Sequence, residues 1–206
     1  DKLPESQAQA RGALGWPEGP LVFLFFGAIR PYKGLQELIT AFRQVGPGLR
    51  LRSDRRGLVT GNLSLDPSNA AGPARLMIAG KPKNESEAAA VRAWVGEDLN
   101  LQVVLERISD QDLACYLRAC DAVVLPFRDI LTSGSAMLAI SEGKPGIAPA
   151  CGCLPELLGE DSSILYPPGD PAGLVEALEK CVQVDLRQMG LNARRRAEAI
   201  TLEATI

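Results

Sequence analysis

Six consecutive apolar residues, Leu21 to Phe26, lie between Pro20 and Gly27. A strand with one face in water alternates apolar with polar residues, so a short unbroken run is typical of a strand buried on both faces of a parallel sheet. Apolar residues then recur at helical spacing from Leu35 to Val45. This strand–turn–helix unit constrains the fold most, because a parallel strand needs helices to cover both of its faces.

The alternation of strand and helix continues along the chain. Further short apolar strands are predicted at residues 76–79, 101–105, 121–126, 146–148 and 164–166. Further helices are predicted at 85–95, after Ser109, at 133–141 (as a buried helix), after Asp170 and at 185–203. Strands joined by helices in this way run parallel, so the sequence predicts an α/β fold with three layers, α/β/α, around a parallel sheet of about six strands.

Composition divides the chain into segments. Residues 1–20 contain three prolines and three glycines, which predicts a linker or domain edge. Residues 21–184 hold the α/β pattern, and residues 185–206 are predicted to be a C-terminal helix. Residues 46–73 break the pattern, and we expect a mobile surface insertion there. Its four arginines fit either a solvated loop or a contact with an anionic surface such as lipid headgroups.

The chain contains no histidine. Within these residues this excludes a Ser-His-Asp or Cys-His hydrolase, a histidine general base and a histidine-ligated metal centre. The five cysteines cannot all pair internally, and a reducing compartment is predicted. Cys151 and Cys153 form a C-x-C without a second matching pair, which favours buried thiols or turn residues over a zinc site.

Charge and hydropathy limit the classes of partner. The formal net charge of -3 disfavours a nucleic-acid partner. No apolar run reaches the length of about 18 residues that a membrane span needs, and the start lacks the pattern of a signal peptide. We therefore expect a cytoplasmic protein.

The turn after the first strand, Gly27 to Gly34, has the composition of an anion site. Ligands of parallel sheets bind where the strands end. Here a glycine lets the backbone pass close to a ligand, and Arg30 and Lys33 lie near the start of a helix. Exposed amides, a positive helix end and two cations favour phosphate. The alternative is a solvated turn.

A second candidate site follows the fourth strand. Ser133, Gly134 and Ser135 open an apolar helix, and their amides and hydroxyls suit phosphate oxygens. The alternative is that Thr132 or Ser133 only caps the helix. Two anion sites at neighbouring strand ends suit a diphosphate. A dinucleotide-binding oxidoreductase is disfavoured, because no G-x-G-x-x-G follows the first strand.

Three sets of segments resemble the C-terminal, donor-binding domain of GT-B glycosyltransferases of retaining family four, the glycosyl transferases group 1. They occur in the family's order over roughly residues 20–200. They are Gly27 to Gly34; then Ile108 to Leu113 with Asp121 to Pro126; then Thr132 to Ser135 with Gly143 to Pro145, Pro155-Glu156 and the turn Tyr166 to Asp170. The resemblance makes residues 21–184 a Rossmann-like donor-binding domain, one half of a GT-B fold.

The resemblance implies a hexosyltransferase of glycan biosynthesis that binds a nucleotide-diphosphate sugar without a metal or other cofactor. Lys33 matches the family's lysine, whereas Ala28 occupies the place of its usual arginine, and we expect Arg30 to take over. Arg30 and Lys33 are the expected catalytic residues, which stabilise the leaving diphosphate. The donor-binding residues implied are Gly27, Ile108 in the loop beside the nucleotide base, Ser133, Gly134, Ser135 and Glu142.

Two family glutamates are absent. Their places, counted from Gly143, are Ile130 and Leu138, and Glu142 is the acid one helical turn beyond Leu138. The departure keeps two alternatives open: a degenerate domain that binds a nucleotide or a partner without turnover, and another GT-B enzyme such as a sugar-nucleotide epimerase or phosphorylase.

The family also has an N-terminal acceptor domain that this chain lacks. We therefore expect the chain to bind a donor without transferring sugar alone. A lipid-linked acceptor would place the protein at the inner face of the membrane as a peripheral protein.

Overall fold

The structure is a computed structural model that describes residues 4–46, 48–49 and 74–203. Within these residues the centre is a six-stranded sheet in the order β3-β2-β1-β4-β5-β6, with every pairing parallel. Its strands are β1 (Val22–Phe26), β2 (Arg75–Ala79), β3 (Leu101–Val104), β4 (Ala122–Val124), β5 (Gly146–Pro149) and β6 (Ser163–Tyr166). The predicted Rossmann-like α/β fold is confirmed.

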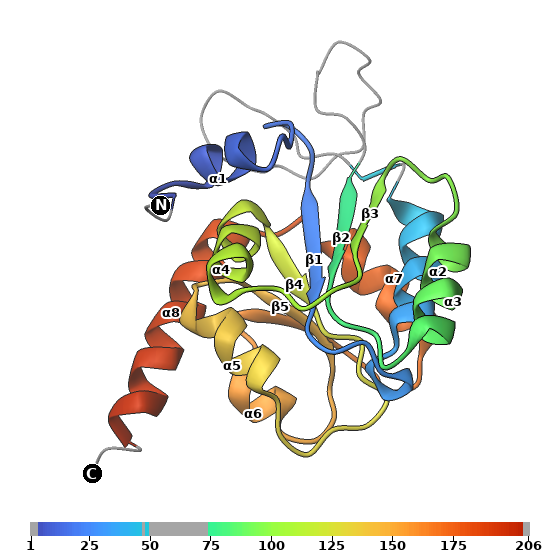
Figure 1. Cartoon of the computed structure of the whole chain (residues 1–206). Coiled ribbons are helices and arrows are strands. Elements are labelled where there is room, and N and C mark those ends of the chain that lie inside the picture. Colours follow the sequence, from blue (N-terminus) through green and yellow to red (C-terminus); the bar gives the residue numbers. More distant parts are fainter. Residues whose placement is uncertain (1–3, 47, 50–73, 204–206) are drawn as a thin grey trace.

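The strand order reverses between β1 and β4. Chain order runs outward from β1 through β2 to β3 on one side, and from β4 through β5 to β6 on the other. Register pairs Phe26 of β1 with Ala79 of β2, and Leu24 with Val123 of β4, so these strands end at one common edge. That carboxyl edge lies at the bottom of Figure 1. In open parallel sheets, the reversal point at this edge is where ligands bind.

Helices cover both faces of the sheet (Figure 1). One face carries α2 (Leu35–Val45), α3 (Glu85–Val95) and α7 (Pro171–Lys180). The other carries α1 (Gln7–Ala13), α4 (Asp110–Ala119), α5 (Gly134–Ser141), α6 (Leu154–Leu158) and α8 (Leu186–Glu203). Along β1, Phe23 and Phe25 join the first of these cores, whereas Leu24 and Phe26 join the second. Burial on both faces is why the strand has no polar position.

Helix starts agree with the predicted caps. Ser109 precedes α4, and its hydroxyl accepts the Asp112 N–H at 3.1 Å. Asp170 caps α7 through the Ala172 N–H at 3.0 Å, and Pro171 is the first helical residue. The expectation that the 133–141 helix is buried holds only in part. Ala136, Ala139 and Ile140 are buried, but Met137 and Leu138 are half-buried.

The expectation of a linker or domain edge over residues 1–20 did not include helix α1. Ser6 caps this helix in a reciprocal pair with Gln9. Arg11 is buried, and its guanidinium donates to the Asp121 carboxylate at 2.7 Å and to the Ala119 carbonyl at 2.9 Å. These long-range contacts fix α1 on the domain, and they are invisible to local sequence patterns.

The predicted insertion at 46–73, with its arginines, lies almost wholly outside the described residues. Among the helices that the structure does describe, none has both the length and the apolar character needed to cross a bilayer.

Candidate functional site

Two loops meet at the carboxyl edge where the strand order reverses. The first runs from Gly27 through the short 3-10 helix η1 (Pro31–Lys33) to Gly34, and the second connects β4 to α5. Gly34 has φ +67°, and a Cβ there would overlap the Pro126 carbonyl oxygen. The Arg128 N–H donates to the Tyr32 carbonyl at 2.7 Å. The loops are therefore in direct backbone contact.

Lys33 and Ser135 converge on Gly27. Gly27 has φ +104°, and a Cβ built there would lie 3.0 Å from Lys33 Nζ and 3.3 Å from Ser135 Oγ. A side chain at position 27 would occupy the space that these two polar groups share. Three residues predicted from two separate segments thus form one cluster above the end of β1.

Lys33 is a buried residue, and its ammonium has no acidic partner among the described residues. The residue is 7% exposed, and Nζ lies 5.3 Å from the centre of the Phe127 ring. Burial lowers the pKa of Lys33, and the nearby charge of Arg30 lowers it further. Among the described residues no carboxylate opposes these two effects. A desolvated cation of this kind attracts an anion.

The N-terminus of α5 faces the same cluster. The Ser133 hydroxyl accepts the Ala136 N–H at 3.0 Å, so Ser133 is a helix cap. The first amides of a helix have no partner within the helix, and here those of Gly134 and Ser135 precede the capped one. Gly134 is exposed, and a Cβ there would meet open space among the described residues. The structure therefore shows that Ser133 caps the helix, and the binding of phosphate by the Gly134 and Ser135 amides stays a prediction.

Arg30 lies beside Lys33. It is half-buried, and its Nη1 donates to the carbonyl of Ile29 at 2.6 Å. A guanidinium has five N–H donors, so this bond leaves others for an anion. The effect of Arg30 on the Lys33 pKa shows that the two charges are close.

Glu142 does not join the cluster. It is the C-cap of α5, whereas the cluster lies at the N-terminus of that helix. An eight-residue helix is roughly 12 Å long at a rise of 1.5 Å per residue, and it runs back to the edge where strands begin. Lys144, two residues after Glu142, supports this placement: its Nζ donates to the carbonyl of Cys120 at 2.9 Å, and Cys120 lies just before the start of β4.

Ile108 lies at the carboxyl edge of the sheet, but at a distance from the cluster of Gly27, Lys33 and Ser135. It precedes α4 in the loop after β3, which is two strands from β1. Adjacent strands are about 4.8 Å apart, so β1 and β3 are separated by about 10 Å. The side chain is half-buried against the core beneath α4 and α5. A ligand that reached both places would have to span that distance.

The two positions that lack the family glutamates have apolar side chains, and their surroundings are apolar too. Ile130 and Leu138 are both half-buried, and both pack against the core that α5 covers. In this neighbourhood the residues that sequence reasoning missed are Phe127 and Arg128, which come directly after strand-ending Pro126. Their position after a predicted strand at the reversal point was the signal that could have found them.

The described residues hold no group of three or more His, Cys, Asp or Glu that could bind a metal ion. All five cysteines are free thiols. Cys151 and Cys153 are half-buried in the turn after β5, and burial raises the pKa of Cys151.

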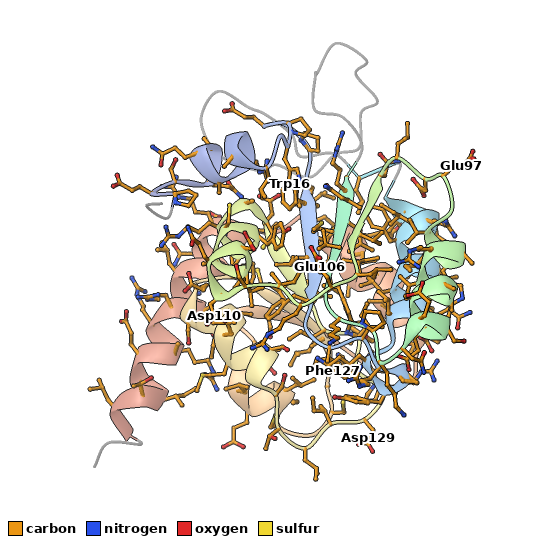
Figure 2. All side chains as sticks on the ribbon, in the orientation of Figure 1. Trp16, Glu97, Glu106, Asp110, Phe127 and Asp129 are labelled. Atoms are coloured by element: carbon orange, nitrogen blue, oxygen red, sulfur yellow. The ribbon has the colours of Figure 1, made fainter. Side chains whose placement is uncertain are left out.

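Figure 2 shows Phe127 and Asp129 at the carboxyl edge, with Trp16 at the opposite end of the sheet.

The chain is similar to known glycosyltransferases. The profile of the family described as glycosyl transferases group 1 matches residues 20–183. Over 127 residues the chain is 30% identical to the GDP-mannose:glycolipid 4-beta-D-mannosyltransferase of Xanthomonas campestris pv. campestris, which covers 61% of this chain and 29% of the relative. The chain thus spans less than a third of that relative.

Solved structures share the fold. The C-terminal domain of a glycosyl transferase group 1 family protein, LpcC, from Francisella tularensis superposes with a TM-score of 0.70 at 17% identity, covering 96% of this chain and 93% of that one. The Anabaena protein HepE in complex with UDP superposes with a TM-score of 0.72 at 18% identity, covering 96% of this chain and 49% of that one. The domain therefore has the Rossmann-like fold found in GT-B glycosyltransferases.

Proposed function

The chain belongs to the glycosyl transferases group 1 family, and on that premise we propose that it binds the nucleoside diphosphate sugar of a glycosyl transfer. The observation that supports this best is the ammonium of the buried residue Lys33, which lies with Ser135 Oγ around Gly27 and has no acidic partner among the described residues. A diphosphate would supply the missing counter-charge. Two other groups beside Lys33 are hydrogen-bond donors as well. They are the first backbone amides of α5 and the guanidinium of Arg30.

The same groups would stabilise the transition state. When the bond between the anomeric carbon and the diphosphate oxygen breaks, negative charge grows on the diphosphate. Lys33, Arg30 and the amides of Gly134 and Ser135 are held in place before the reaction, so they need little reorganisation. Burial strengthens these interactions because the local dielectric is low. We propose that this stabilisation works without a metal ion, which a chelator in the binding assay tests.

The donor and acceptor are proposed from the relatives. The Xanthomonas relative is named for GDP-mannose and a glycolipid, which makes GDP-mannose the first donor to test. The neighbour solved with UDP makes UDP the second nucleotide. A glycolipid acceptor would bring the protein to a membrane surface as a peripheral protein.

Transfer itself is proposed to need a second domain. The chain spans 29% of the mannosyltransferase and 49% of the UDP-bound protein, and the similar Francisella structure is described as a C-terminal domain. The acceptor would bind in a cleft completed by that second domain. Robust transfer by the 206-residue chain alone would contradict this proposal.

The resemblance implies that the transfer retains the anomeric configuration. The relative's name specifies a β-linked mannose. The anomeric configuration of the product of the complete enzyme therefore tests retention. Proton NMR of that product gives its anomeric configuration. An anomer opposite to that of the donor would contradict retention and leave donor binding unaffected.

Calorimetry with GDP, UDP, ADP and their sugars tests the donor site. Lys33→Ala should weaken the binding of the preferred diphosphate by about 1–3 kcal/mol, roughly 5- to 150-fold, because a charge-assisted contact is lost. Lys83→Ala, at an exposed lysine in the next loop, is the control and should bind normally. If Lys33→Ala binds as tightly as the control, the first loop is not the phosphate site.

A competing function is a domain that binds nucleotide without turnover, and the apolar Ile130 and Leu138 favour it. The complete protein would then bind diphosphate yet transfer no sugar. A radiolabelled donor with a membrane-lipid acceptor fraction separates the two functions.

A further inference from the structure

We propose that Arg128 and Glu37 are positioning residues of the diphosphate site: they hold the loop that carries Lys33 against the loop that leads to α5. The inference rests on the proposed donor site, but neither residue is part of the cluster formed by Gly27, Lys33 and Ser135. Arg128 lies after β4, and Glu37 is in the first turn of α2.

The two loops face each other residue by residue in reverse order. Arg128 N–H donates to the carbonyl of Tyr32 at 2.7 Å. The Phe127 ring lies 5.3 Å from Lys33 Nζ. The Pro126 carbonyl lies so close to Gly34 that only glycine fits. The second loop therefore contacts the backbone on both sides of Lys33 and, through Phe127, the ammonium itself.

The side chain of Arg128 extends this contact to α2. Its Nε donates to Glu37 Oε1 at 2.7 Å, and its Nη2 donates to the same oxygen. The guanidinium thus connects the loop after β4 with the helix that begins directly after Gly34. With one backbone bond and two side-chain bonds, Arg128 spans both ends of the segment from Tyr32 to Glu37.

Energetics favour a positioning role over a stabilising one. The side chains of Arg128 and Glu37 are 56% and 35% exposed, and such pairs contribute little to stability. Glu37 Oε2 is buried without a hydrogen-bond partner among the described residues, which is unfavourable for folding. The residue Glu37 lines a cavity of about 160 Å³ that Arg30 also lines. The Arg128–Glu37 contact therefore adds little to stability, and a role in holding Lys33 in place explains it. A small displacement of a binding group weakens ligand binding strongly.

Two measurements on the full chain test the inference. The first is calorimetric affinity for GDP and UDP, and the second is the titration of Lys33 in the unliganded chain, followed by NMR of its side-chain carbon next to Nζ. The variants are Arg128→Ala, Arg128→Lys, Glu37→Gln and the double variant Glu37→Gln/Arg128→Ala. The control is Arg92→Ala, which breaks an exposed Arg92–Glu85 pair of 2.6 Å within α3.

Arg128→Ala should weaken diphosphate binding at least tenfold, while its melting temperature changes no more than that of the control. Arg128→Lys should recover part of the affinity, because one donor can still reach Glu37. Glu37→Gln should add little to Arg128→Ala, because both changes break the same contact. The pKa of Lys33 should rise toward its ordinary value in Arg128→Ala, since the freed ammonium can reach water and move away from Arg30.

Equal loss of affinity in Arg128→Ala and Arg92→Ala would overturn the inference, as would an unchanged Lys33 titration in folded Arg128→Ala. If the unaltered chain binds neither nucleotide, the proposed function fails at that point. The Lys33 titration then still decides the positioning role, because it needs no ligand.

Discussion

At the scale of the residue, Lys33 is held in a setting that disfavours its own charge. Burial and the charge of Arg30 both lower its pKa, and the neutral Phe127 ring lies 5.3 Å from its Nζ. Protein cores rarely retain an unpaired ammonium without a functional reason. The proposed function supplies that reason, because a bound anion would offset the cost of burying the Lys33 charge.

The lowered pKa of Lys33 predicts a pH dependence of binding. Only the ammonium form attracts phosphate, and bound phosphate raises the pKa again, so diphosphate affinity should fall as the pH rises through the lowered Lys33 pKa. This decline should begin at a lower pH than an exposed lysine would produce. Calorimetry across alkaline pH measures it, and Lys33→Met, which cannot titrate, should lack this decline.

The stability of the unliganded chain has the opposite dependence. Because the folded-state pKa is below the unfolded value, the unfolded chain binds more protons between the two values, and stability should rise with pH across that interval. The advantage in stability of Lys33→Met over the unaltered chain should shrink over the same interval. A constant difference would mean that Lys33 is not buried as a cation.

At the scale of the element, α5 connects the site to the core. Its first turn presents amides beside Lys33, and its later turns bury Ala136, Ala139 and Ile140 against the sheet. Ser133 contributes both to the start of the helix and to the site. Its hydroxyl accepts the Ala136 N–H and so sets the direction of the first two amides. The cap is therefore expected to matter for binding as well as for stability.

Ser133→Ala should cost about 1 kcal/mol of stability through the lost cap and should weaken diphosphate binding at least fivefold. The matched control is Asp170→Ala, which removes the cap of α7 after β6, three strands from β1. It should lower stability by a similar amount and leave binding intact. Urea unfolding and calorimetry on both variants measure the two effects, and equal binding by both would separate the α5 cap from the site.

At the scale of the whole molecule, the two edges of the sheet carry different groups of residues. The carboxyl edge holds the polar cluster, whereas α1 is attached at the opposite edge, where its Arg11 is paired with Asp121. The Asp121 carboxylate also accepts the Val22 N–H at 2.7 Å, so it links α1 with the starts of β1 and β4. Stability and binding should therefore respond to different substitutions.

Arg11→Met should destabilise the chain by roughly 3–5 kcal/mol, because it leaves the largely buried Asp121 without its cation. Diphosphate affinity of the folded protein should be unchanged, since the substitution lies at the far edge. Urea unfolding gives the first quantity and calorimetry at low temperature the second. A large loss of affinity in the folded variant would contradict the separation of roles.

Much of this arrangement could be predicted from the chain alone. Strand and helix positions follow from apolar runs and helical spacing, which are local properties, and Ser109 and Asp170 are local caps. Gly27, Lys33, Ser133, Gly134 and Ser135 could be singled out because they follow strands whose ends meet at one edge. Helix α1 had a local signal, the Ser6–Gln9 capping pair, that the prediction did not use. Its docking could not be predicted locally, because the partners of Arg11 lie more than 100 residues away.

Local patterns along the chain predict a parallel α/β sheet and the loops that lie at its carboxyl edge, since both depend on residues close together in the chain. Which of those residues meet follows from the packing of the folded chain alone. That packing brought Lys33 to Ser135 over Gly27 and placed Glu142 at the far end of α5. It also set Arg128 against Glu37, 91 positions away. Such pairings depend on how the loops of separate strands pack, and no periodicity in the chain encodes that.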